Sequence, residues 1–148
     1  MKASVTWQEG MAFKAHLDGF DFLIDASEKV GGRNLGPRPK GLTLVSLAGC
    51  TGMDVISILG KMRVEVDRFS VDIDARLVED HPRKFSSITI TYVLEGKDIP
   101  ADKVRKAVSL SENRYCGVSA SLKPAVSIGS EIEINGERID PVAVAEED

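Results

Sequence analysis

The sequence contains few of the residues from which many common reaction centres are built. It has two histidines, His16 and His81, and they fall in different predicted elements. The sequence therefore does not support a histidine-rich metal site or a cysteine–histidine nucleophile pair. Gly31 and Gly32 form too short a glycine run for a phosphate-binding loop, and no Lys-Ser or Lys-Thr pair follows them.

An excess of basic residues and a long apolar run are also missing. Lys and Arg number 19 against 23 Asp and Glu, so the formal net charge is −4 at pH 7. A nucleic-acid partner requires a basic surface that displaces counterions, and this charge argues against one. No apolar run approaches the ~20 residues of a membrane span. Residues 1–7 lack the apolar segment of a signal peptide, so we expect no membrane partner and a cytoplasmic location.

What remains is the composition of an ordinary globular protein. The chain has 148 residues, of which 43% are hydrophobic and 28% charged. This length fits one domain, 1–148, large enough to bury a core without disulfides. The periodicity and the turn residues predict these parts: a β-meander over 1–30, a loop over 31–40, a central helix over 41–62, a β-hairpin over 68–95, helices over 100–122 and C-terminal strands over 124–139. The expected class is α+β.

The central helix is unusually apolar, because Asp54 is its only charged residue between Leu42 and Leu59. Such a helix should be buried nearly all round. The predicted strands can cover it on one side only, so we expect its other side to meet the same helix of a second copy in a homodimer. The alternative is a monomer in which one open sheet surrounds the helix.

The two cysteines lie in apolar, helix-like stretches, Cys50 in the central helix and Cys116 after the second one. In a cytosolic chain two cysteines are more often free thiols or a transient redox pair than a structural disulfide. Taken singly, each would be interpreted as a small core residue, because free cysteine is among the most buried residue types.

A redox role would require a thiolate, which a thiol of ordinary pKa near 8.5 rarely forms at neutral pH. The N-terminus of the central helix is too far from Cys50 to help, since the helix dipole acts mainly within the first turn. Arg33 and Arg38, in the preceding loop, are the candidate cations. The alternative is that both are solvated loop residues.

Two carboxylates would oppose the arginines, because a nearby negative charge disfavours the thiolate form of a cysteine. Asp54 lies one turn after Cys50, and Glu112 lies one turn before Cys116. Asp54 interrupts an apolar helix, so it would either hold an arginine in the site or lie at a water-filled dimer seam. Glu112 is most simply part of a solvated helix end.

The two cysteine contexts resemble those of the OsmC/Ohr family of thiol-dependent hydroperoxide reductases, and more closely its OsmC-like branch. Pro39 precedes an apolar helix that carries Leu47-Ala-Gly-Cys50, and the second motif is Cys116-Gly-Val-Ser119. The resemblance implies an OsmC-like fold, with antiparallel sheets wrapped around the central helix in an intertwined dimer. It also implies active sites at the subunit interface and an apolar substrate pocket. Candidate lining residues, for which core packing is the alternative, are Phe20, Phe22 and Met53.

The resemblance also implies a reaction. Cys50 would reduce an organic hydroperoxide to an alcohol and become a sulfenic acid, which Cys116 would convert to a disulfide. A dithiol reductant, a lipoyl-protein or a thioredoxin-like protein, would restore the thiols, without metal or organic cofactor. The family typically has a glutamate two residues after the proline, where this chain has Gly41. Either Asp54 or Glu112 replaces it, or the protein is a weakly active or non-catalytic dimeric small-molecule-binding or stress protein.

Overall fold

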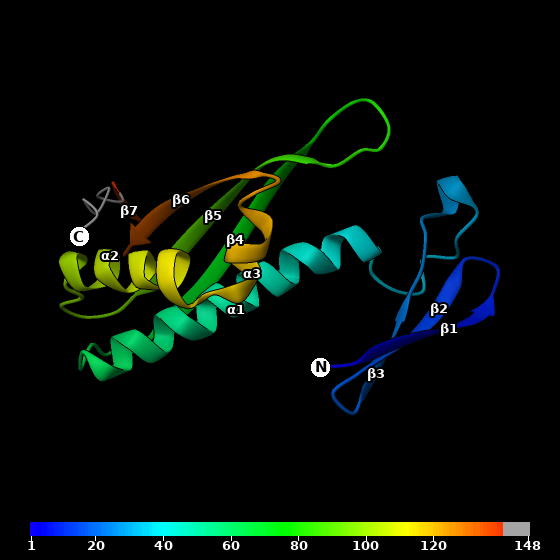
Figure 1. Ribbon diagram of the computed structural model, residues 1–148. Helices are drawn as coiled ribbons and strands as arrows, with labels where there is room; N and C mark the ends of the chain where they lie inside the picture. The colour runs from blue at the N-terminus through cyan, green and yellow to red at the C-terminus, as the bar shows by residue number, and fades with distance from the viewer. Residues whose placement is uncertain (141–148) are drawn as a thin grey trace. The chain divides into compact units, whose positions relative to one another are not determined.

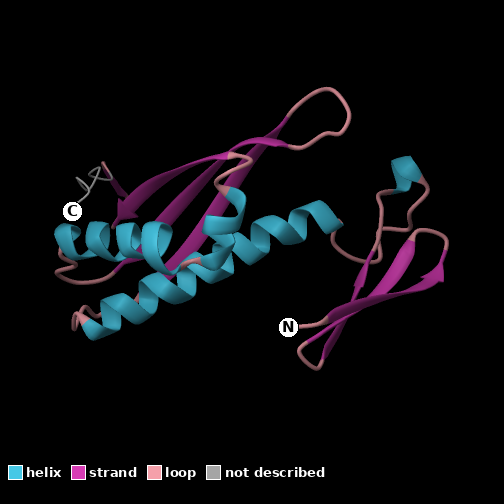
Figure 2. Cartoon of the chain, in the orientation of Figure 1, coloured by secondary structure: helices cyan, strands magenta, loops and turns pink. Residues whose placement is uncertain are grey.

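The computed structural model describes residues 1–140 of the chain. The described residues form two compact units, 1–45 and 46–140, each with its own sheet (Figures 1 and 2). The mixed α+β class and the central helix expected from the sequence are both present. The assignment of residues 1–148 to a single domain stays a prediction.

The first unit is built on the expected antiparallel meander, β1 (Ala3–Glu9), β2 (Ala12–Leu17) and β3 (Phe20–Ile24). Asp18 and Gly19 connect β2 to β3 with φ values of 51° and 87°. Two consecutive positive φ angles suit the right-handed twist of a two-residue hairpin, which explains the Asp-Gly pair. A short 3₁₀ turn, η1 (Glu28–Val30), then leads into the irregular loop.

Helix α1 (Pro39–Lys61) begins two residues before the predicted start, at the proline itself. Proline suits the first helical position because its φ angle is preset and its missing N–H would have no helical partner there. The helix is buried on one face only within the chain: Leu47, Val55 and Leu59 are fully buried, whereas the side chains of Met53 and Ile56 are exposed. The expectation of burial all round is therefore not met by one chain alone.

By length and composition alone α1 could cross a membrane, since its most apolar 18-residue window has a mean hydropathy of 1.8. The sequence expectation that no apolar run approaches a membrane span is wrong for this helix. Small and hydroxylated residues interrupt its apolar run without lowering the average much. The core helix of a protein that never enters a membrane meets the same criterion.

The second unit contains a four-stranded sheet in the order β4 (Arg68–Leu77), β5 (Phe85–Glu95), β6 (Ser127–Ile134) and β7 (Glu137–Ile139). The pairs β4–β5 and β6–β7 are antiparallel, but β6 runs parallel to β5. The expectation of purely antiparallel sheets is wrong here, because a helical crossover returns the chain to the end of the sheet where β5 began. Asn135 and Gly136, with φ values of 51° and 80°, make the expected hairpin turn into β7.

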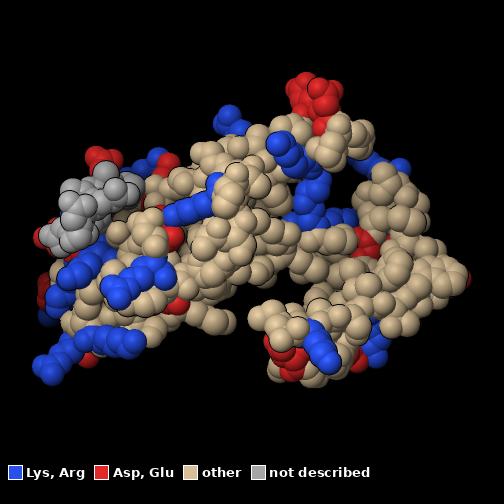
Figure 3. Space-filling model, viewed as in Figure 1, with Lys and Arg blue, Asp and Glu red and all other residues tan. Residues whose placement is uncertain are grey.

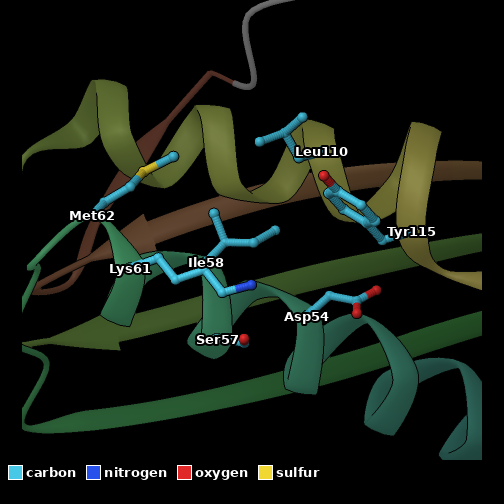
Figure 4. A pocket seen from close by; sticks show the side chains of 7 residues that line it. All are labelled: Asp54, Ser57, Ile58, Lys61, Met62, Leu110 and Tyr115. Carbon is cyan, nitrogen blue, oxygen red and sulfur yellow. The ribbon is translucent and has the colours of Figure 1, made fainter.

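That crossover consists of α2 (Ala101–Leu110), a π-helical turn η2 (Ser111–Tyr115) and α3 (Gly117–Leu122). In the second unit α1 and α2 lie side by side on one face of the sheet (Figures 1 and 4). The core-facing residues of β5 alternate along the strand and are Ile88, Ile90, Tyr92 and Leu94. Gly52 of α1 permits close approach, because a Cβ atom there would lie 3.2 Å from Cγ2 of Val71 on β4.

Candidate functional site

The fold of the second unit brings the two cysteines together. The Sγ atoms of Cys50 and Cys116 and a carboxylate oxygen of Asp54 all lie within 4.8 Å of one another. Cys50 and Asp54 are one turn apart on α1, so their side chains share a face of the helix. Cys116 comes from the N-cap of α3. Three of the six candidate residues thus form one group, which we call the Cys–Cys–Asp cluster.

The two thiols are free and differ in their surroundings. Cys50 is half-buried, whereas only 3% of Cys116 is exposed. The backbone N–H of Ser119 donates a hydrogen bond to Sγ of Cys116 over 3.3 Å. Burial raises the pKa of Cys116, the neighbouring Cys50 adds to this, and the Ser119 N–H offsets only part of it. Cys116 therefore favours the neutral thiol.

Asp54 is positioned by the π-helical turn. The hydroxyl of Ser111, the first residue of that turn, donates to Oδ2 of Asp54 over 3.2 Å. The same Ser111 oxygen lies 3.4 Å from the carbonyl oxygen of Thr51 on α1. π-Helical turns are rare overall, and those that do occur are often found at functional sites. Here the turn joins the crossover to the face of α1 that carries Cys50.

Glu112 is not part of a solvated helix end, as the sequence had indicated. Its carboxylate accepts hydrogen bonds from the hydroxyls of Tyr92, at 3.0 Å, and Ser130, at 3.4 Å. Burial raises the pKa of Glu112, and the two hydroxyl donors and the charge of Lys123 only partly compensate. The π-helical geometry, which sequence periodicity cannot show, turns this side chain toward the sheet.

Sequence reasoning missed Tyr92. It is fully buried on β5, and burial, together with the charge of Glu112, raises its pKa. The one signal in the sequence that could have indicated this residue is its position as a tyrosine on the core side of an alternating strand. A buried phenol needs a hydrogen-bond partner, so such a position indicates a buried polar contact.

Arg33 and Arg38 make their contacts within the first unit, Arg33 to the end of β1 and Arg38 inside its own loop. Nη1 of Arg33 lies 3.2 Å from a carboxylate oxygen of Glu9. Arg38 donates to the carbonyl oxygen of Gly36 and to Oδ1 of Asn34, at 2.7 and 2.6 Å. Arg38 is therefore bound within its loop, whereas the Arg33 side chain is half exposed, and the role of both toward the thiols stays a prediction.

Asp25, which sequence reasoning also missed, shapes that loop. Its carboxylate accepts three backbone N–H bonds, from Ala26, Arg33 and Leu35, at 2.7, 3.0 and 3.2 Å. Only 2% of the residue is exposed. Burial by itself would raise the pKa of Asp25, but the three donors and the charge of Arg33 outweigh it, and the pKa lies below its ordinary value.

A pocket of about 330 Å³ lies between α1 and the α2–η2 segment, with Asp54 on its wall (Figure 4). Its other lining residues are Ser57, Ile58, Lys61, Met62, Leu110 and Tyr115. The side chain of Lys61 extends along α1 in the direction of Asp54 (Figure 4). Lys and Arg side chains gather over α2 and the C-terminal end of α1 (Figure 3). The pocket therefore adjoins both the Cys–Cys–Asp cluster and a basic surface.

The three apolar candidates for pocket lining do not line this pocket. Phe20 and Met53 are about three-quarters exposed, at 75% and 74%, and Phe22 is 38% exposed. Within the described residues of the single chain, Phe20 and Met53 are therefore not packed in a core, and their role stays a prediction.

Comparison with known proteins agrees with the motifs around the cysteines. The sequence model of the OsmC-like protein family matches residues 31–131, which include α1, both cysteines and most of the second unit. The chain belongs to the OsmC-like family. The predicted family and the OsmC-like α+β fold with its central helix are therefore confirmed, whereas the intertwined dimer stays a prediction.

Among the relatives of this OsmC-like protein is protein YhfA of Escherichia coli strain K12. The two are 33% identical over 135 residues, which cover 90% of this chain and 98% of YhfA. A solved structure of a hypothetical protein from Aquifex aeolicus VF5 is 29% identical, with a TM-score of 0.76, over 90% of this chain and 96% of that one.

An organic hydroperoxide resistance protein OsmC from Legionella pneumophila has the same fold. Its TM-score is 0.68 over 89% of this chain and 95% of that one. Because the two are only 12% identical, this match supports the fold alone.

Proposed function

We propose that this OsmC-like protein is a cysteine-based peroxidase that reduces organic hydroperoxides to alcohols. The observation that carries the proposal is the proximity of the two sulfur atoms, which lie within 4.8 Å of each other and of Asp54. The substrate class is part of the proposal and follows the names of two solved proteins that share the fold, both organic hydroperoxide resistance proteins.

The different burial of the two thiols supports the division of roles. Cys50 is the accessible thiol and attacks the peroxide: its sulfur takes one oxygen, the alcohol leaves, and a sulfenic acid forms. Cys116 then attacks that sulfur, water leaves, and a disulfide closes. Because burial keeps Cys116 a thiol, it does not compete for the peroxide. A dithiol reductant, a lipoyl-protein or a thioredoxin-like protein, returns both thiols by exchange.

The proposal includes a cytoplasmic homodimer. Met53 and Ile56 expose an apolar face of α1 that the chain does not cover, and a second copy would bury it. One arginine, Arg33 or Arg38, would then favour the Cys50 thiolate in the assembled site.

The alternative is a dimeric small-molecule-binding protein with weak or no peroxidase activity. Two observations favour it: the pocket beside Asp54, and Gly41 at the place of the family's glutamate. Inert thiols under peroxide, together with retention of an apolar ligand, would select this alternative.

The test is a thiol titration of the reduced, metal-free protein after addition of one equivalent of cumene hydroperoxide. We expect rapid loss of both thiols in the wild type and loss no faster than for a free thiol in Cys50→Ser. Cys116→Ser should still consume peroxide and should accumulate a sulfenic acid that dimedone traps. Ser57→Ala, which changes the pocket wall but neither thiol, is the control. Equally slow loss in the wild type and Cys50→Ser would contradict the proposal.

A further inference from the structure

The Cys–Cys–Asp cluster combines two thiols and a carboxylate, a donor set that suits zinc. The sequence predicts no metal because histidine is scarce and because the family resemblance implies none. Neither reason takes account of Asp54 as a third donor beside the two cysteines. We propose that the reduced protein binds a zinc ion through Sγ of Cys50, Sγ of Cys116 and a carboxylate oxygen of Asp54.

The distances fit this assignment. With Zn–S bonds of about 2.3 Å, two sulfurs on a tetrahedral zinc ion lie about 3.8 Å apart. The three donor atoms already lie within 4.8 Å of one another, so about 1 Å of movement per pair forms the site. The half-buried Cys50 and Asp54 leave the fourth position to water or to a ligand.

The groups around the donors already have the arrangement expected of supporting contacts at a metal site. Ser111 donates to one carboxylate oxygen of Asp54, which orients the other. The Ser119 N–H donates to Sγ of Cys116. The Ser119 hydroxyl is fully buried and has no hydrogen-bond partner among the described residues, so it is available to the site. The pocket with Asp54 on its wall provides a path for the ion.

Zinc binding would replace the two thiol protons, which are released to solvent, without any redox change. One consequence rests on the proposed peroxidase function. A zinc-bound thiolate attacks peroxide more slowly than a free thiolate, and a disulfide cannot hold zinc as two thiolates. Zinc would therefore protect the reduced pair, and oxidation would release the ion.

The test uses the full-length reduced protein, freed of metal and kept without oxygen. Zn²⁺ is titrated against a chromophoric chelator, and Co²⁺ serves as a spectroscopic probe of thiolate ligation. We expect about one ion per chain and a sulfur-to-cobalt charge-transfer band. Wild-type protein with both thiols alkylated should show neither, and this control requires no substitution.

Variants assign the ligands. Cys50→Ser and Cys116→Ser should each weaken the charge-transfer band and the affinity, and Asp54→Asn should weaken zinc binding by about tenfold or more. The matched control is Asp98→Asn, an exposed turn residue with φ of 53° that asparagine tolerates. Binding that Asp54→Asn leaves unchanged, or a wild type that binds no more zinc than its alkylated form, would overturn the proposal.

The zinc proposal and the peroxidase proposal can be contradicted independently of each other. The titration uses no peroxide, and the peroxide assay uses metal-free protein. If both activities exist, one equivalent of Zn²⁺ should slow thiol loss in the wild type. Protection at the same Zn²⁺ concentration should be weaker in Asp54→Asn, provided that this variant still reacts with peroxide.

Discussion

Asp25 in the first unit and Glu112 in the second are both withdrawn from solvent, yet their pKa values shift in opposite directions. Asp25 accepts three backbone N–H bonds, and its pKa is lowered despite burial. Glu112 accepts two hydroxyl bonds, one of them long, and burial prevails and raises its pKa. The number and quality of donors decide whether burial stabilises or destabilises a carboxylate.

The two carboxylates also have different roles in the molecule. Asp25 uses its charge to hold the loop that carries Arg33 and Arg38. Glu112 belongs to the turn that positions Asp54 and leads to Cys116. The carboxylate with three backbone donors supports structure, and the carboxylate with two hydroxyl donors lies next to the Cys–Cys–Asp cluster.

The largest expected effect is that of Asp25→Asn. A lowered folded-state pKa contributes stability that is present above the ordinary aspartate pKa and is lost as pH falls. The variant should therefore be less stable than the wild type at neutral pH, and the difference should shrink on acidification. Urea denaturation across this range measures it, with the exposed turn variant Asp18→Asn as the control. A difference that does not change with pH would contradict the assigned role.

The next effect is that of Tyr92→Phe, which removes the stronger donor to Glu112. We expect a loss of about 1 kcal/mol in the free energy of unfolding at neutral pH. With fewer donors the pKa of Glu112 should rise further, so the loss should be smaller in acid, where the carboxyl is protonated. Equal losses at both pH values would show that the Tyr92 hydroxyl does not stabilise the Glu112 charge.

Glu112→Gln should have a smaller effect of opposite sign. A raised folded-state pKa means that stability falls as pH rises from the ordinary glutamate pKa through the folded value. Glutamine keeps an acceptor for Tyr92 without the charge, so the variant should be more stable at neutral pH by less than about 1 kcal/mol. The gain should vanish in acid. The exposed Glu79→Gln is the control, and a destabilised Glu112→Gln would contradict the comparison.

Ser130→Ala should have the smallest effect. Its hydroxyl lies 3.4 Å from the Glu112 carboxylate, at the long limit of a hydrogen bond. We expect a loss below about 0.5 kcal/mol in the free energy of unfolding. A loss as large as that of Tyr92→Phe would show that the two donors are equivalent.

Several parts of the fold could be predicted because their signals are local. The meander, the apolar helix and the hairpin follow from alternation, helical spacing and Asp-Gly or Asn-Gly turns. Cys50 and Cys116 could be singled out from their motifs. Asp54 stood out as the one charge in an apolar helix, and it does lie beside both sulfurs.

Other features could not be predicted because they depend on segments that are distant in the sequence. The parallel pairing of β6 with β5 depends on where the crossover returns the chain. The partnership of Tyr92 and Glu112 joins a strand to a π-helical turn whose geometry has no periodic signature. The three donors to Asp25 come from a loop that composition marks only as irregular.

The sequence by itself determined most of the elements, the family and the candidate side chains of the site, because backbone preference, hydrophobic periodicity and short motifs act over a few residues. The tertiary structure alone decided which of those side chains meet and how each carboxylate titrates. Proximity, burial and hydrogen-bond donors are contributed by elements that the chain brings together only when it folds.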